Sequence, residues 1–194
     1  RYYFMRAIPF GNDGSFSWED MAARYTSELA NDFGNLASRL GAMIEKYCDG
    51  KVPSRANDSA LESALISTVK SADAAICALD FQGGINSIME FCKTVNGYVT
   101  AREPWAVAKD ESRKSELGEI LYNTAEALRA LAVLLHPIMP ISTEKLWSSL
   151  GAAKDLGALS SQRIDGVARW GQLVPGSAMT KGEILFPRLE EPKP

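Results

Sequence analysis

Apolar residues recur at spacings of three and four along the first quarter of the chain, which is the period of an amphipathic helix. Ser17 offers an N-cap, so we expect one long helix over about residues 17–48. Gly34 and Gly41 fall inside it, and because glycine in a helix costs about 1 kcal/mol relative to alanine, close packing or a bend is expected at both. The apolar positions are Met21, Tyr25, Leu29, Phe33, Leu36, Leu40, Met43 and Tyr47.

Further stretches of the same period predict more helices. Asn57 or Asp58 can cap the second, Asp80 restarts the pattern before Pro104, and Ser112 can cap the fourth. Prolines after Leu135 break the fourth helix, because proline cannot continue the hydrogen-bond ladder. Ser142 can then cap a short fifth helix. The expected ranges are about 58–79, 80–103, 112–135 and 142–150.

After Gly151 the helical period is lost, and no pattern of several β-strands occurs anywhere. We therefore predict an all-α fold, a helical bundle of four to five helices with an extended C-terminal tail that packs back on it. By this reading residues 17–150 form the bundle and residues 151–194 form the wrapping tail. The apolar opening residues 1–8 read as the end of an element whose partners lie upstream, in a longer protein, and residues 9–14 are dense in turn formers.

The composition, 46% hydrophobic and 23% charged, is typical of a globular chain, and the net charge of −3 argues against binding a long nucleic-acid duplex. Three widely spaced cysteines indicate reduced thiols and a cytoplasmic protein. With a single histidine and no paired cysteines, no metal site is expected. No apolar run reaches 18 residues, so we predict no membrane span.

Asn31, Asn35 and Arg39 form one polar row on the first long helix, since residues four apart lie one above the other. An amide and a guanidinium one turn apart supply several donors and an acceptor, which can read the edge of a base or hold a carboxylate. By position alone, a solvated helix face is the default interpretation.

Pro104-Trp105 lies at a break between two helices. A tryptophan there can plug the end of the core, which is the default for a large ring. If the ring is partly exposed, it can instead stack on an unpaired base, a contact worth about 1–3 kcal/mol. Recognition of single-stranded RNA commonly combines such stacking with hydrogen bonds to base edges.

The chain offers no catalytic group that stands out. His136 has no nucleophile placed beside it by sequence, and the better interpretation is a histidine satisfied at a helix C-terminus. Cys48, Cys77 and Cys92 read as small apolar core residues. There is no glycine-rich phosphate loop, so no catalytic and no cofactor-binding residue is predicted within this chain.

Several segments, in order, resemble the anticodon-binding domain of methionyl-tRNA synthetases, and together they cover nearly the whole chain. The region around His136 and Trp147 is similar to class I synthetases in general. The two signatures of the family's active site, of the His-Ile-Gly-His and Lys-Met-Ser-Lys-Ser types, are absent. The parts specific to the methionine enzyme are the first segment, residues 8–16 with Arg24-Tyr25 and residues 29–39, which include Asn35-Leu36-Ala37-Ser38-Arg39, and Pro104-Trp105. Asn96-Gly97-Tyr98-Val99, which comes before Pro104-Trp105, is also similar to the family.

The resemblance implies that Asn35 and Arg39 bond to the first base of a CAU anticodon, and that Trp105, preceded by Pro104, stacks under the anticodon bases. The implied partners are the anticodon loop of tRNA(Met) and a catalytic domain of the same polypeptide, which residues 1–16 would join. ATP and magnesium would serve that methionine-tRNA ligase, and no cofactor would bind this chain. No appended dimerisation domain follows, so the sequence offers no evidence of dimerisation.

Two alternatives stay open from the sequence. The chain can be the corresponding domain of another class I synthetase, with a different anticodon. It can also be a helical protein–protein interaction scaffold, in which Asn35 and Arg39 lie on a solvated helix face and Trp105 belongs to the core. Burial of Trp105 and its distance from Arg39 separate the scaffold from the RNA-binding interpretation.

Overall fold

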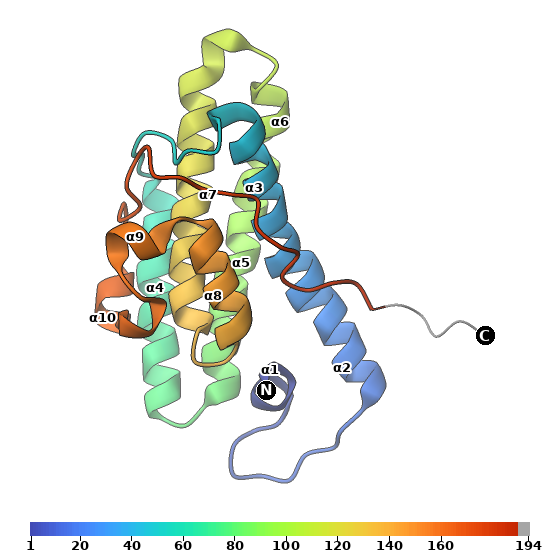
Figure 1. Ribbon diagram of the computed structural model, residues 1–194. Helices are drawn as coiled ribbons and strands as arrows, with labels where there is room; N and C mark the ends of the chain where they lie inside the picture. Colours follow the sequence, from blue (N-terminus) through green and yellow to red (C-terminus); the bar gives the residue numbers. More distant parts are fainter. Residues whose placement is uncertain (190–194) are drawn as a thin grey trace, which may run out of the picture.

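The first long helix is present in the computed structural model, which describes residues 1–189, and it runs on without a break from α2 to α3 (Figure 1). Its N-cap is Ser17, whose hydroxyl accepts a hydrogen bond from the Asp20 amide at 3.2 Å, as predicted. Its middle third is a π-helix, which the sequence analysis did not anticipate. The three parts are α2 (Trp18–Arg24), the π-helical η1 (Tyr25–Gly34) and α3 (Asn35–Cys48).

Two long antiparallel helices, α4 (Ser59–Cys77) and α5 (Phe81–Arg102), form a hairpin beside it. Asp58 caps α4 by accepting hydrogen bonds from two backbone amides of the first turn. Asp80 caps α5 in the same way, with the Gly83 amide at 2.8 Å. Both starts agree with the sequence prediction, because an aspartate in this position satisfies donors that the helix leaves unpaired.

Helix α7 (Lys114–Leu135) forms the centre of the bundle, and every side chain from 120 to 132 is buried. It follows the short α6 (Pro104–Val107) and a 3₁₀ turn, η2 (Glu111–Arg113). The expectation that Ser112 caps this helix is wrong. Asp110 accepts from the Ser112 amide and caps η2 instead, and α7 then continues directly from that turn.

The next helix, α8 (Pro140–Ser149), starts two residues before the predicted cap Ser142, because proline is well suited to the first helical position. The sequence analysis predicted an extended segment after Gly151. That prediction is wrong for the first part of the segment, which is helical. Long-range contacts rather than periodicity fold its first part: Trp147 Nε1 donates to the Gly157 carbonyl and Arg129 to the Val167 carbonyl. Its elements are α9 (Ala152–Leu156), the 3₁₀ turn η3 (Leu159–Ser161) and α10 (Ile164–Val167).

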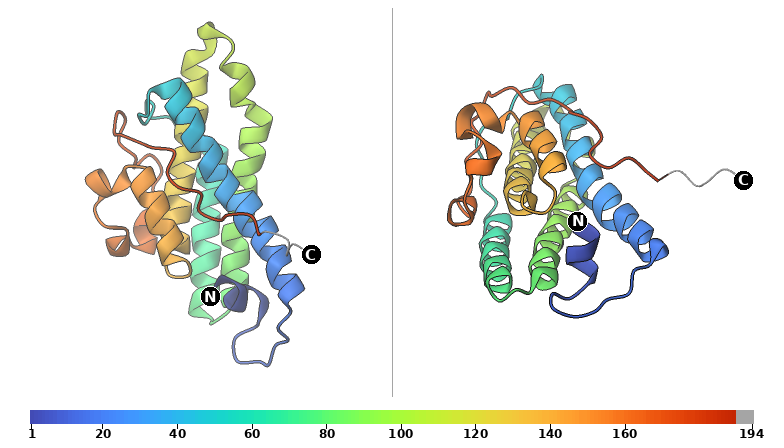
Figure 2. Two further views of the ribbon diagram at one scale, coloured as in Figure 1. Left: turned by 45° about the vertical axis from the view of Figure 1, so that its right-hand side comes forward. Right: turned by 60° about the horizontal axis from the view of Figure 1, so that its bottom comes forward.

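The remaining described residues form the tail, here residues 168–189, which crosses the outer face of α3 (Figure 2). Gly41 makes this crossing possible, since a Cβ there would lie 2.6 Å from the Cα of Lys181. The Thr180 amide donates to the Ser149 carbonyl at 2.8 Å, so the tail also joins α3 to α8. The predictions of a tail that packs back, and of close packing at Gly41, are confirmed.

The opening helix α1 (Tyr2–Ala7) packs against α5 at one end of the bundle, and α6 lies at the other end (Figure 1). Within residues 1–189, no helix is both long and apolar enough to cross a membrane. The same residues form the all-α bundle with a returning tail that the apolar periodicity predicted.

Candidate functional site

Asn35 and Arg39 lie one turn apart at the start of α3, about 6 Å along the helix axis. Three apolar neighbours on the opposite side of the helix, Phe33, Leu36 and Leu40, are almost completely buried. These anchors fix the rotation of the helix about its own axis. As a result, Asn35 is exposed and Arg39 is half-buried at the surface.

The π-helix ends directly before Asn35, whose amide donates to the carbonyl five residues back, at Ala30. The Asp32 carbonyl in this stretch accepts a hydrogen bond from Asn96 Nδ2 of α5 at 3.1 Å. Burial raises the pKa of the Asp32 carboxyl, and the nearby Lys93 ammonium partly opposes that rise. Asn96 therefore holds the turn that presents Asn35, a supporting role that its helical position in the sequence did not reveal.

Trp105 is presented by a sharp change of direction between α5 and α6. Glu103 adopts the left-handed conformation, with φ of 45°, and the buried Pro104 then begins α6 at its first helical position. The Ala106 amide closes the turn on the Glu103 carbonyl at 2.8 Å. The indole ring is left 38% exposed, so Trp105 is not the core plug that its residue type suggests. The tryptophan that does lie in the core is Trp147 of α8, which is 1% exposed.

The structure brings the two predicted features together. The guanidinium carbon of Arg39 lies over the Trp105 ring, 5.2 Å from its centroid. Among the residues that the structure describes, no hydrogen bond or ion pair engages the side chain of Asn35 or Arg39. One aromatic face and a set of uncommitted donors and acceptors therefore meet at the surface.

A groove of about 440 Å³ is lined by Asn31 and Asn35, and the tail forms its far wall; neither Arg39 nor Trp105 lines it. Close packing or a bend was expected at Gly34, and the tail supplies the close packing. Phe186 of the tail covers Gly34, because a Cβ there would meet the Phe186 ring at 3.3 Å. The groove is lined by Ala30, Asn31, Gly34, Asn35, Ser38, Ile184, Phe186, Pro187 and Arg188.

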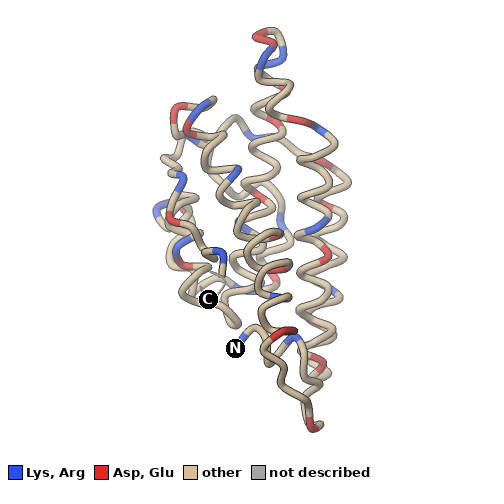
Figure 3. Tube along the Cα trace, turned by 90° about the vertical axis from the view of Figure 1, so that its right-hand side faces the viewer, with Lys and Arg blue, Asp and Glu red and all other residues tan. Residues whose placement is uncertain are grey.

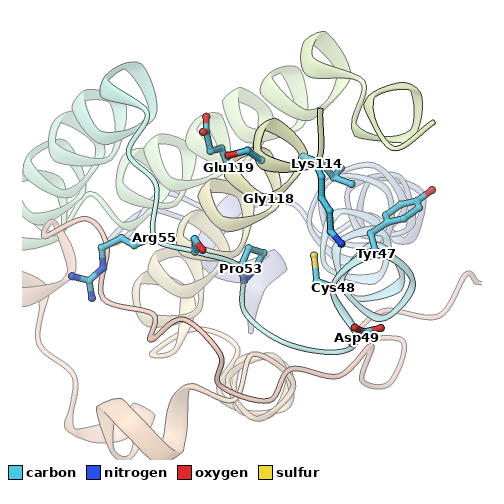
Figure 4. A pocket seen from close by; sticks show the side chains of 11 residues that line it. Tyr47, Cys48, Asp49, Pro53, Arg55, Lys114, Gly118 and Glu119 are labelled. Carbon is cyan, nitrogen blue, oxygen red and sulfur yellow. The ribbon is translucent and has the colours of Figure 1, made fainter. Parts of the chain in front are cut away.

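A second hollow, of about 430 Å³, lies between the end of α3 and the start of α7 and contains none of the predicted site residues (Figure 4). Cys48 is the one cysteine among the residues that line it. Burial and the Asp49 carboxylate raise the pKa of the Cys48 thiol, against a smaller opposing effect of Lys114. A thiol held in its protonated form is a poor nucleophile.

The other titratable candidates are also engaged in structural contacts. His136 Nδ1 lies 3.0 Å from the Thr143 hydroxyl, at the junction of α7 and α8, where a satisfied histidine was expected. Cys92 is buried, as predicted for a core residue, whereas Cys77 is exposed and departs from that expectation. No cluster of potential metal ligands occurs within the described part of the chain.

Two family models match the chain. The model described as the anticodon-binding domain of tRNA ligase matches residues 58–165, which include Pro104 and Trp105. The model described as tRNA synthetases class I (M) matches residues 1–41, which include Asn35 and Arg39. Asn35 and Arg39 thus lie in the region matched by one family model, and Pro104 and Trp105 lie in the region matched by the other.

Curated relatives are similar over almost the whole chain. A methionine–tRNA ligase of Streptomyces coelicolor is 58% identical across 98% of this chain, which covers 37% of that relative. A methionine–tRNA ligase of Halalkalibacterium halodurans is 38% identical across 98% of this chain, which covers 29% of it. The chain therefore spans about a third of the length of these relatives.

Solved structures agree with the sequence comparisons. The free form of methionyl-tRNA synthetase from Mycobacterium tuberculosis superimposes with a TM-score of 0.85 at 30% identity, over 98% of this chain and 38% of the other. The form of that enzyme bound by methionyl-adenylate superimposes with a TM-score of 0.83 at 30% identity, over 96% of this chain and 37% of the other.

Proposed function

Because the chain belongs to the family of anticodon-binding domains of tRNA ligases, we propose that it reads the CAU anticodon of tRNA(Met) within a methionine–tRNA ligase. The observation that carries this proposal is the Arg39 guanidinium over a partly exposed Trp105 ring, with Asn35 one helical turn away. Trp105 offers a surface for stacking, and Asn35 and Arg39 offer groups that hydrogen-bond to the edge of a base. Single-stranded RNA is commonly recognised by these two kinds of contact.

The first anticodon base, a cytosine, fits the available groups. Its pairing edge carries two acceptors, O2 and N3, beside one donor, the N4 amino group. Arg39 donates to the acceptors, and the Asn35 carbonyl accepts from N4 while its amide remains a further donor. Uracil presents N3–H and a carbonyl in place of N3 and the amino group, so it mismatches the same pair. Trp105, held by Pro104, supports the unstacked bases from one face.

In this proposal the chain positions the tRNA and performs no chemistry itself. The remainder of the polypeptide binds methionine and ATP with magnesium and attaches methionine to the acceptor end. A relative from Mycobacterium tuberculosis is described as bound by methionyl-adenylate, which supports the use of ATP in the family. Residues 1–16 join that catalytic domain, residues 17–150 bind the anticodon, residues 151–189 wrap the bundle, and the protein works in the cytoplasm.

The surface charge fits a few aimed contacts rather than a broad RNA-binding face. Lysine and arginine are interspersed with aspartate and glutamate along the described trace (Figure 3). A protein that holds RNA mainly through phosphates concentrates its cations in one patch. Here the selectivity comes from Trp105, Asn35 and Arg39, so the dependence of affinity on salt is expected to be shallow.

The two alternatives lose support. An interaction scaffold predicts a buried Trp105 far from Arg39, whereas the ring is 38% exposed and lies under that guanidinium. An anticodon-binding domain for another amino acid would be most similar to other synthetases, whereas the relatives described above are methionine–tRNA ligases.

A titration with anticodon stem-loops tests the proposal. The chain is expected to bind a CAU stem-loop more tightly than one whose first anticodon base is changed to uracil. Arg39→Ala should abolish most of this difference, whereas Arg163→Ala, which removes an exposed arginine near α10, should leave it intact. Equal affinity for the two stem-loops would refute methionine specificity.

A further inference from the structure

The groove between the first long helix and the tail lies next to the pair of Asn35 and Arg39. Its floor is one face of that helix, from which Asn31, Asn35 and Ser38 line it. Asn35 belongs to both features, because it lines the groove and also lies one turn from Arg39. A ligand that reaches Asn35 from the side of Trp105 therefore has the groove directly beside it.

The tail forms the opposite wall and runs beside this helix (Figure 2). The Tyr25 hydroxyl donates to the Pro187 carbonyl at 2.7 Å. The Phe186 ring meets the rings of Tyr25 and Phe33, with the centroids 6.1 Å apart in each case. Gly34, which has no side chain, lets Phe186 approach the helix. The groove is thus already formed in the free chain, so little conformational entropy is lost when a ligand enters it.

The floor and the wall of the groove differ in chemistry. The floor presents the amides of Asn31 and Asn35 and the hydroxyl of Ser38. Within residues 1–189, no hydrogen bond engages these three side chains. The wall is apolar at Ile184, which is 66% exposed. Amides and a hydroxyl can bond to the edge of a base, whereas an apolar side chain packs on its face.

The charge and the size of the groove favour an anionic ligand as large as a nucleotide. Arg188 is the one charged residue among those that line the groove. The hollow of similar volume between α3 and α7 includes the carboxylates of Asp49 and Glu119. A volume of about 440 Å³ lies within the range of about 300–1,000 Å³ that is usual for ligand sites. Groups that bond an edge, an apolar wall and one cation together match the base and the phosphate of a single nucleotide.

We propose that the groove binds a second unpaired nucleotide of the tRNA, one that adjoins the first anticodon base. Its base bonds along one edge to Asn31 and Ser38 and packs one face against Ile184. This inference rests on the proposed function, since it takes the first anticodon base to lie at Asn35 and Arg39. It also extends that function, because the tail then forms part of the RNA-binding surface.

Continuity with Asn35 favours this occupant over a free small anion. A neighbouring nucleotide is tethered to the base at Asn35, so it reaches the groove at a high effective concentration. A free anion would depend on the single exposed guanidinium of Arg188, and exposed ion pairs contribute little in water. The groove is therefore best suited to a ligand that is already held at Asn35.

A substitution in the wall tests the proposal without altering Asn35, Arg39 or Trp105. Ile184→Asp places a carboxylate beside the phosphate of the bound nucleotide and should weaken binding of the CAU stem-loop by about tenfold or more. Ile141→Asp adds the same charge at a side chain 76% exposed on α8 and should leave the affinity unchanged. Fluorescence anisotropy of a labelled stem-loop measures both. An affinity of the Ile184→Asp variant equal to that of the control would overturn the proposal.

Stem-loops that lack one base identify the nucleotide. Asn31→Ala should weaken binding of the intact CAU stem-loop by about three- to tenfold, the value of one hydrogen bond. Removal of the base on the 5′ side, or on the 3′ side, of the first anticodon base should abolish this effect in one of the two RNAs, because the bonded edge is then absent. An effect that persists in both RNAs would overturn the proposal, and so would the lack of any effect with the intact stem-loop.

The preference for cytosine over uracil at the first anticodon base is measured in the same variants. Asn31→Ala and Ile184→Asp should both keep it, because Asn35 and Arg39 are unchanged. Loss of the preference in either variant would mean that the groove holds the first base itself, and the proposal would fail. A preference in the unmodified chain with no effect of either variant refutes only this inference, whereas no preference in the unmodified chain refutes the proposed function.

Discussion

The guanidinium of Arg39 lies over the indole ring of Trp105, 5.2 Å from the ring centroid, and so links α3 to α6. A cation above an exposed aromatic ring contributes about 0.5–1 kcal/mol. This contact orders the ring before any ligand arrives, and it places the donors of Arg39 beside the surface on which a base would stack. The pair is therefore preorganised for the recognition of a base that we propose.

Trp105→Ala is expected to weaken binding of a CAU stem-loop by about 1–3 kcal/mol, the value of one stacked base. Because the ring is partly exposed, the variant should keep its fold and unfold at nearly the same temperature. Fluorescence anisotropy of a labelled stem-loop gives the affinity, and circular dichroism gives the melting temperature. Trp105→Phe, which keeps a smaller ring, should retain much of the affinity, and wild-type affinity in the alanine variant would rule out stacking.

Gly41→Ala is expected to destabilise the protein by about 1–3 kcal/mol, because the added methyl group overpacks against backbone of the tail. The nearest obstacle, the Cα of Lys181, would be 2.6 Å away. Gly97→Ala is the matched control on α5, where a Cβ would meet nothing within 4 Å. That change should stabilise by up to about 1 kcal/mol through helix propensity. Urea unfolding measures both, and a Gly41→Ala protein as stable as the control would contradict the close crossing.

Glu126→Ala is expected to destabilise the protein by about 3–5 kcal/mol, since it leaves a buried arginine without its counter-ion. The Glu126 carboxylate accepts from Arg129 Nε at 2.8 Å and also from the Gln172 and Leu173 amides, at 3.1 and 3.0 Å. Urea unfolding again provides the measurement. Glu90→Ala, which breaks the exposed pair with Lys93, should hardly move the midpoint. Similar losses in the two variants would show that burial of the pair is unimportant.

The three cysteines are expected to react with a thiol reagent in a fixed order. Burial raises the pKa of the Cys92 thiol to about 12, so its reactive thiolate is scarce at pH 8 and remains scarce at pH 10. Cys77 is exposed and should react at once, the partly buried Cys48, whose pKa is also raised, should react second, and Cys92 should react only when the protein unfolds. Absorbance of the released thiol, followed with and without urea, records the order. Cys77→Ser should remove the fast phase, and rapid reaction of all three thiols in the folded protein would contradict the burial of Cys92.

Most helices of the bundle could be predicted from sequence because they bury one apolar stripe, and that stripe is a local pattern; α7, buried on every side from 120 to 132, is the exception. The ends were harder to place. Asp58 was correctly chosen as a possible cap, but Ser112 and Ser142 were not caps, since Asp110 and Pro140 begin their elements earlier. Which of several nearby residues caps a helix depends on the path of the incoming chain, which local sequence does not encode.

The candidate site was predictable in parts but not as a whole. The polar row containing Asn35 and Arg39 followed from helical spacing, and the turn before Trp105 followed from Pro104. Neither feature predicted their contact, because the distance between α3 and α6 is set by the packing of the whole bundle. The groove wall formed by the tail was missed for the same reason, since Phe186 covers Gly34 across more than a hundred residues of chain.

The π-helix from Tyr25 to Gly34 makes the spacing of this chain intolerant of small deletions. Loss of one residue in that stretch, with the rest of the helix unchanged, would turn everything before it by roughly a quarter of a turn relative to α3. The chain would then lose either the hydrogen bonds that Tyr2 and Arg6 of α1 donate to Glu28, or the burial of the core positions around Leu36. Insertions and deletions in homologous chains should therefore avoid residues 25–34 and collect in the loops, so the length of this segment is itself an inherited part of the site.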